Sequence, residues 1–131
     1  MMLLLFAGAL QLLVAAANIP LTVMLNFGRE HARLSPIVRQ IHHVHHVYLG
    51  LLLVVFAAIS LMFPRDLAAG DGLGRFVSVV LAVFWGARLA IQRLYYDRAF
   101  LSQHRAGDVV FSAIFTVLFA VYAAAAAGAL R

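Results

Sequence analysis

The chain has 131 residues, 65% of them apolar, and a formal net charge of +5. A soluble domain is typically only about 45–50% apolar, so the composition excludes an ordinary soluble domain and indicates an integral membrane protein. Cysteine is absent, which excludes disulfides, thiolate metal sites and iron–sulfur clusters. No part of the sequence resembles a nucleic-acid-binding module, so nucleic acid is not an expected partner.

Apolar stretches take up almost the whole chain, and each is long enough to cross a bilayer as a helix. They cover about residues 1–25, 36–63, 76–96 and 109–130. The connections between them are too short to form a soluble domain. We therefore predict an all-α integral membrane protein, with residues 1–131 forming a single four-transmembrane-helix bundle.

The first stretch carries no charge before Arg29, so we interpret it as a retained helix rather than a cleaved secretory signal. Pro20 is expected to kink this helix and to free a backbone carbonyl. At helical spacing, one polar stripe runs along it: Gln11, Asn18, Thr22 and Asn26. Polar groups in lipid seek partners, so this stripe is expected to face other helices.

The second stretch is predicted to begin at Pro36, because Ser35 before it is a suitable N-cap. A histidine cluster lies at the edge of its apolar part: His42, His43, His45 and His46. An ionisable residue in a membrane segment is a functional-site hypothesis by default. Further along, His46, Gly50, Leu53, Ala57 and Ser60 form a stripe that is mostly of small residues and suits close helix contact.

Residues 64–75 contain a proline and several glycines and are expected to form a flexible turn. The third helix then places the following residues on one side: Ser78, Leu81, Trp85, Arg88, Gln92 and Tyr95. Arg88 lies roughly 10 Å deeper than Tyr95, at 1.5 Å per residue. We predict that Arg88 avoids lipid and pairs with Asp97, Asn26, the carbonyl freed by Pro20 or a bound anion.

On the fourth helix, Ser112, Thr116 and Tyr122 lie near one face. The expected core of the bundle contains Asn18, Thr22, His46, Gly50, Trp85, Arg88, Gln92 and Thr116.

Arginine counts in the connections predict the orientation in the membrane. One end carries Arg29, Arg33, Arg39, Arg93, Arg98 and Arg105, and the other carries Arg65, Arg75 and Arg131. All six histidines fall at the end that is richer in arginine. We expect that end in the cytoplasm and both termini outside, in a bacterial-type cytoplasmic (inner) membrane.

This one-sided placement suggests a metal site as a first hypothesis. His42 and His46 are one helical turn apart, and neutral imidazole is a good ligand for a divalent transition metal. The candidate ligands are His42, His45, His46, His104, Asp97 and Glu30.

Haem is a second hypothesis. A haem held between helices needs imidazoles on facing helices, and only the second stretch carries histidines within its span. His104 or a second copy of the chain would have to supply the other axial ligand.

An anion or lipid-headgroup site is a third hypothesis, because arginine binds carboxylate and phosphate through paired hydrogen bonds. The candidate binding residues are Arg39, Arg88, Gln92 and Asn26. Such a site would suit a lipid-handling protein, a small transporter or a quinone-associated subunit.

A purely structural role stays open beside these hypotheses, because histidines at headgroup depth need no ligand. Ser60 and Ser112 have no neighbouring histidine, so no nucleophile–base pair is visible and catalysis is undecided. We expect a binding or accessory subunit of a membrane complex, with the lipid bilayer and either another subunit or a second copy as partners.

Overall fold

The computed structural model describes the backbone of residues 1–24 and 32–131 and the side chains of residues 1–18 and 32–131. Within these ranges the chain is helical and contains no strand. The long helices are α1 (Met2–Met24), α3 (Pro36–Met62), α5 (Gly72–Ala90) and α7 (Arg105–Ala126). Two six-residue helices, α4 (Pro64–Ala69) and α6 (Arg98–Gln103), and one π-helical segment, η1 (Ile91–Tyr95), lie between them. The predicted all-α fold is confirmed.

Of the described helices, three are long and apolar enough to cross a membrane: α3, α5 together with η1, and α7. The described apolar part of α1, Met2–Asn18, is shorter. Only a minority of the residues in each of the three apolar segments is buried inside the protein. Most of their apolar surface therefore faces outward.

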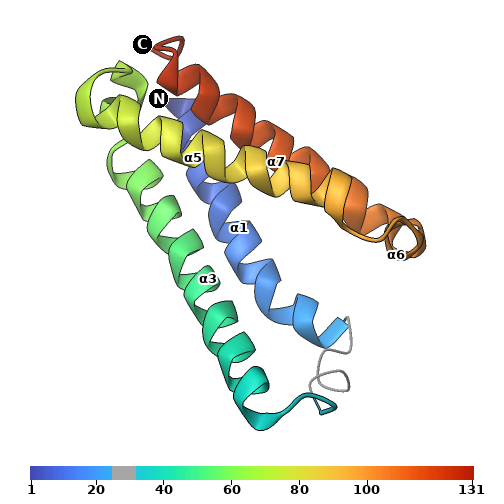
Figure 1. Ribbon diagram of the computed structural model, residues 1–131. Helices are drawn as coiled ribbons and strands as arrows, with labels where there is room; N and C mark the ends of the chain where they lie inside the picture. Colours follow the sequence, from blue (N-terminus) through green and yellow to red (C-terminus); the bar gives the residue numbers. More distant parts are fainter. Residues whose placement is uncertain (25–31) are drawn as a thin grey trace.

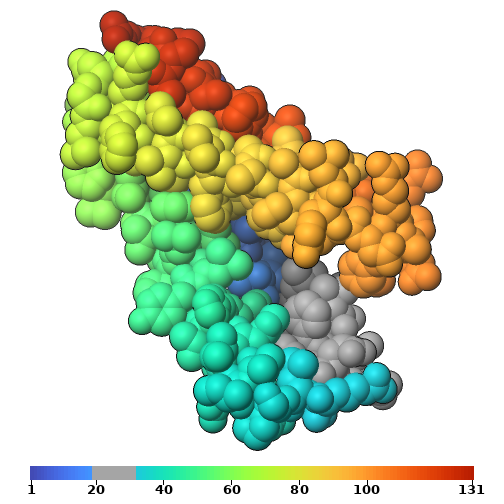
Figure 2. Space-filling view, viewed as in Figure 1, coloured from blue at the N-terminus to red at the C-terminus, as the bar shows by residue number. Residues whose placement is uncertain are grey.

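The long helices form two hairpins (Figure 1). One consists of α1 and α3, and the other consists of α5 and α7. The hairpins meet near the chain termini and diverge toward their other ends, so that α6 and the beginning of α3 lie far apart. We call the end near the chain termini, where the hairpins meet, the closed end. We call the end where they diverge the open end. In Figure 2 the surface is hollowed between α3 and the α5–η1 segment on the open side.

The core occupies the closed end and the middle of the protein. On α3 the buried residues are Leu53, Ala57 and Ser60, all in its second half. Trp85 and Tyr122 are the largest fully buried side chains, and the ring of Trp85 stacks on Phe115 with 5.6 Å between centroids. The predicted small-residue stripe on α3 is therefore buried from Leu53 onward. Its first two members, His46 and Gly50, are only half-buried.

The segment between α3 and α5 is more ordered than the predicted flexible turn. Pro64 occupies the first turn of α4, where its missing N–H costs nothing, and Gly70 ends α4 in the left-handed region at a φ of 67°. α5 then begins at Gly72, four residues earlier than expected. At Gly74 a Cβ atom would overlap the carbonyl of Asp66, so only glycine lets α5 start this close to α4.

The closed end is also fastened by the C-terminal tail. Arg131 Nε donates a hydrogen bond to the Ala69 carbonyl across 2.7 Å. A Cβ on Gly70 would lie 2.6 Å from Gly128 Cα, which shows how closely the tail passes α4.

The predicted core is correct only in part. Trp85 and Gln92 are buried, whereas Asn18 and Arg88 are half-buried. The prediction for Thr116 is wrong: this residue is exposed, and its hydroxyl donates to the Ser112 carbonyl of the preceding turn across 2.7 Å. The side chains of Pro20 and Thr22 lie outside the described range, although the α1 backbone stays helical as far as Met24.

Candidate functional site

A polar junction joins all four long helices in the middle of the core. Gln11 Nε2 donates to the Tyr122 hydroxyl across 2.6 Å and lies 3.3 Å from Ser60 Oγ. Trp85 Nε1 donates to Gln11 Oε1 across 3.1 Å. The hydroxyls of Ser60 and Tyr122 are 2.5 Å apart. We call Gln11, Ser60, Trp85 and Tyr122 the polar junction.

All members of the polar junction are almost completely buried, and each is hydrogen-bonded to at least one other member. Ser60 also donates to the Phe56 carbonyl one turn earlier, across 3.0 Å. A fully satisfied polar network in an apolar environment fixes the register between helices. Because its donors are already used within the core, the polar junction is a structural feature rather than a ligand site.

A second polar group lies between α5–η1 and α7, toward the open end. Asp108 accepts a hydrogen bond from Gln92 Nε2 across 2.9 Å, and its Oδ1 lies 3.5 Å from Arg93 NH2. Arg93 NH2 also donates to Ser112 Oγ across 2.5 Å. Ser112 Oγ in turn lies 3.4 Å from Asp108 Oδ1. The single carboxylate of Asp108 is thus the centre of three polar contacts.

The π-helical segment explains why Gln92 and Arg93 act on the same partner. A π turn contains an extra residue and turns less per residue than an α-helix, so adjacent side chains diverge less. It also shifts the register beyond it. The α-helical spacing places Tyr95 on the same side as Trp85 and Gln92, but Tyr95 is 82% exposed, and it is Tyr96 that contacts Arg88.

Arg88 lies one turn before Gln92 and has no hydrogen-bonding or ionic partner among the described residues. Its guanidinium carbon is 5.3 Å from the ring centroid of Tyr96 and 4.9 Å from that of Phe115. Its NH1 atom is buried and makes no hydrogen bond; among the described side chains, only Ser78 Oγ shares that condition. A buried cationic nitrogen without an acceptor is costly, and such an atom needs an explanation.

The position of Arg88 in the fold follows from its neighbour Trp85. Trp85 contacts Gln11 of the other hairpin, and Arg88 lies three residues further along α5 in the same buried stripe. The hairpins diverge toward the open end (Figure 1). Arg88 therefore lies about one turn of α5 beyond a contact between the two hairpins, and its guanidinium lies over Tyr96.

The histidine cluster lies on the first turns of α3, at the tip of the open end. His42, His43 and His45 are exposed, and His46 is half-buried. His45 Nδ1 lies 2.8 Å from the Ile41 carbonyl, one turn earlier on the same helix. The cluster is therefore placed at the surface of α3 and not in the core of the bundle.

The expected partners of that cluster lie on the other hairpin. His104 stacks on Phe100 with 4.4 Å between ring centroids, and its Nδ1 lies 3.1 Å from the Phe100 carbonyl. Asp97 caps α6 by accepting the Ala99 N–H across 3.1 Å. Among the residues whose side chains are described, no group of three histidines or acids is placed to hold a metal. Glu30 lies outside these residues, so a metal site that includes it stays a prediction.

The candidate anion-binding residues are likewise separated. Arg88 and Gln92 are neighbours on α5–η1, whereas Arg39 is exposed on the first turn of α3. Asn26, the remaining candidate, lies outside the described residues.

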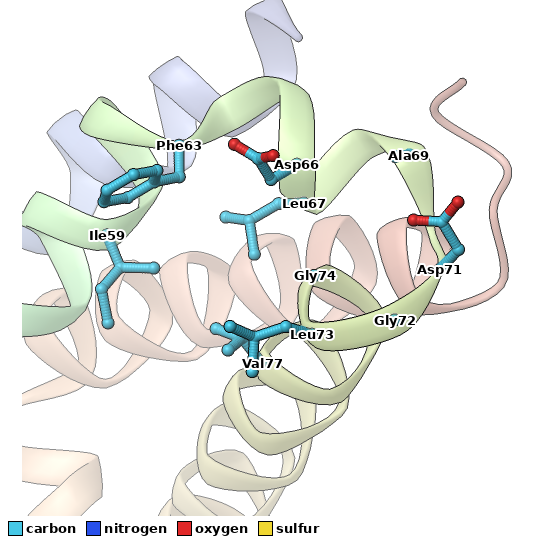
Figure 3. A pocket seen from close by; sticks show the side chains of 10 residues that line it. All are labelled: Ile59, Phe63, Asp66, Leu67, Ala69, Asp71, Gly72, Leu73, Gly74 and Val77. Atoms are coloured by element: carbon cyan, nitrogen blue, oxygen red, sulfur yellow. The ribbon is translucent and has the colours of Figure 1, made fainter.

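A cavity of about 570 Å³ lies at the closed end, between the end of α3, α4 and the start of α5 (Figure 3). Its wall is mainly apolar, with Ile59, Phe63, Leu67 and Val77 among its lining residues. Asp66 and Asp71 also line it, and both are exposed. Its lining residues include no buried polar side chain that would define a ligand, so we assign it no chemistry.

No model of a protein family, no curated protein and no solved structure matches this chain.

The sequence pattern indicates some of the polar residues that the structure brings together. It identifies Arg88 and Gln92 through their position in an apolar helix, and it identifies Gln11 as part of an inward polar stripe. It does not find the role of Asp108 and Arg93, whose positions in the sequence indicate only charges near the ends of helices. The signal that could have found them is that Arg93 is next to Gln92 and that Asp108 lies one helical turn before Ser112.

Proposed function

We propose that this chain is a four-span membrane protein with a binding or accessory role, and that it binds the anionic group of an amphiphile at Arg88. The observation that supports the proposal best is the buried NH1 of Arg88, for which the described residues provide no hydrogen-bond partner. The bound group would be a carboxylate or a phosphate, because these match the planar donor pattern of a guanidinium.

The aromatic contacts of Arg88 leave its donors available. A cation lies over the face of an aromatic ring, and Tyr96 and Phe115 both contact Arg88 in this way. The N–H groups of a guanidinium lie in its plane and point outward from its edge. Rings can therefore stabilise the charge and fix its orientation without using the hydrogen bonds that an anion would accept.

An amphiphile fits the surroundings better than a small free anion. The angle between the hairpins opens toward the predicted membrane edge, and the outward faces of α3, α5 and α7 are apolar. A carboxylate or phosphate at Arg88 would keep its apolar tail against these faces, where burial is favourable.

The proposed placement in the membrane follows the arginine distribution. α1 would serve as the fourth span of one 1–131 domain, with the open end in the cytoplasm and both termini outside a bacterial-type inner membrane. The lipid bilayer, and a larger membrane complex or a second copy, would cover the apolar exterior.

The single tryptophan provides a direct test, because Trp85 is three residues from Arg88. Bromine atoms quench indole fluorescence only at short range. We would titrate the purified protein in dodecyl maltoside with dibrominated stearate, dibrominated stearate methyl ester and inorganic phosphate. Saturable quenching by the acid, absent with the ester and relieved by unbrominated stearate, is the expected result. Relief by inorganic phosphate alone at similar concentration would identify a free anion rather than an amphiphile as the ligand.

Two variants define the role of Arg88 in that titration. Arg88→Gln should weaken binding by about tenfold or more, the value of one charged hydrogen bond of roughly 1.5 kcal/mol. Arg98→Gln is the matched control, because it removes the same charge from an exposed position on α6 and should have no effect. Equal quenching by acid and ester, or unchanged binding by Arg88→Gln, would contradict the proposal.

A further inference from the structure

Of the two arginines Arg88 and Arg93, the more exposed one is paired with a carboxylate. Arg93, whose side chain is 49% exposed, holds Asp108, whose side chain is 14% exposed. Arg88, which has a buried nitrogen, has no carboxylate partner within the described part of the chain. Water can stabilise an exposed guanidinium, whereas a buried one depends on a protein or ligand partner. The better-solvated arginine therefore has the counter-ion and the worse-solvated one does not.

Asp108 is the carboxylate that the described contacts bring to the side of α5–η1 on which Arg88 lies. Gln92, one turn beyond Arg88 on the same side of the helix, already donates to Asp108 across 2.9 Å. The Arg88 guanidinium lies over the rings of both Tyr96 and Phe115, and Phe115 is on α7, the helix that also carries Asp108. In the structure, however, the ion pair of Asp108 is with Arg93.

Arg93 reaches Asp108 from within η1. The π-helical register places Gln92 and Arg93, adjacent in sequence, on the neighbouring side chains Asp108 and Ser112. In an α-helix adjacent side chains diverge by about 100°, which is more than in a π turn. π turns within α-helices occur frequently at functional sites.

We infer that Arg93 is a positioning residue that keeps Asp108 away from Arg88 and so leaves Arg88 available for an anionic ligand. This inference rests on the proposed function for the ligand, but the pairing on which it depends can be measured without one. Arg93 and Gln92 together hold the Asp108 carboxylate, which would otherwise neutralise the Arg88 guanidinium.

The first measurement is the arginine side-chain 15N–1H spectrum of the protein in dodecyl maltoside, without added ligand. The Arg88 signals are assigned by their loss in Arg88→Lys. In Arg93→Gln we expect the Arg88 N–H groups to exchange more slowly with water and to shift, because Asp108 then pairs with Arg88. The double variant Arg93→Gln/Asp108→Asn should return the Arg88 signals to those of the wild type.

The second measurement is the stearate titration described above. Arg93→Gln should weaken binding by about fivefold or more, because apparent affinity falls with the fraction of Arg88 that is free. Arg93→Lys keeps a cation beside Asp108 and should retain binding. Asp108→Asn should leave the affinity close to that of the wild type, because Arg88 is already free of Asp108.

The outcomes separate the two proposals. Unchanged Arg88 signals in Arg93→Gln would overturn the inference even if binding weakens, since a general charge effect would then explain the loss. A wild-type protein that fails to bind stearate would overturn the proposed function, while the spectra would still decide the pairing. If Arg93→Gln does not fold, a wild-type spectrum in which Asp108→Asn alters the Arg88 signals would overturn the inference, and unaltered signals would support it.

Discussion

The indole N–H of Trp85 on α5 donates to the side-chain oxygen of Gln11 on α1 across 3.1 Å, and this bond joins the two hairpins in the middle of the core. The amide nitrogen of the same Gln11 reaches Tyr122 on α7. One side chain of α1 thus connects to both helices of the other hairpin.

Replacing Gln11 by alanine should lower the free energy of unfolding by about 1–3 kcal/mol. The substitution leaves the Trp85 N–H without an acceptor and the Tyr122 hydroxyl without its donor, both in a buried position. Unfolding in mixed detergent, followed by Trp85 fluorescence, measures the loss. Gln103→Ala, at an exposed position on α6, is the control and should change stability by less than about 0.5 kcal/mol.

Removing only the hydroxyl of Tyr122 tests whether the polar junction acts as a unit. Tyr122→Phe keeps the ring, and Ser60→Ala removes the hydroxyl 2.5 Å away. Each substitution should destabilise the protein, and the double variant should lose less than the sum, with a coupling of about 0.5–1.5 kcal/mol. Strictly additive losses would mean that these hydroxyls do not cooperate. Tyr95→Phe, at an 82% exposed position, should be nearly silent.

Two glycine substitutions should have opposite effects. A Cβ atom added at Gly50 would have no neighbour within 4 Å, so Gly50→Ala should stabilise α3 by about 0.5–1 kcal/mol. Gly74→Ala places its Cβ against the Asp66 backbone and should destabilise the protein by about 1–3 kcal/mol. Thermal unfolding of both variants in the same detergent gives the comparison. A stabilised Gly74→Ala protein would show that α4 does not pack against the start of α5 in this way.

The position of the histidine cluster leads to a prediction about the metal content of two variants. If His42 and His46 provide a metal site, the other ligand must come from outside the described side chains or from a second chain, because Asp97 and His104 lie on the other hairpin. Elemental analysis after dialysis against zinc should therefore show the same metal content in Asp97→Ala, His104→Ala and the wild type. A loss of zinc in either variant would show that the two hairpins close on each other around the metal.

The amino-acid sequence predicts the all-helical fold because the four apolar stretches are long and separated by clear breaks. It places the start of α3 correctly at Pro36, since serine before proline is a strong local signal. It misses α4, because Gly70 and Gly72 suggest a flexible turn although α4 is stabilised by its contact with the C-terminal tail. Contacts between residues so distant in sequence leave no local pattern.

The site is predictable only as far as helical periodicity holds. Trp85, Arg88 and Gln92 follow the α-helical spacing, and the sequence places them on one side correctly. Tyr95, which the same spacing puts on that side, is exposed because η1 changes the spacing, and no single residue in the segment indicates a π turn. The pairing of Arg93 with Asp108 joins residues of two different elements and leaves no local pattern in the sequence.

The polar junction joins the two hairpins in the middle of the core, and beyond it both hairpins continue toward the open end. At about 1.5 Å per residue, His42 lies roughly 27 Å along α3 from Ser60, so tilting one hairpin by about 10° moves it by roughly 5 Å. The same tilt hardly moves Trp85 or Tyr122. A small change of angle at the junction would thus produce a large change in the distance between the start of α3 and α6. Paired spin labels at Gln40 and Ser102 would report that distance directly.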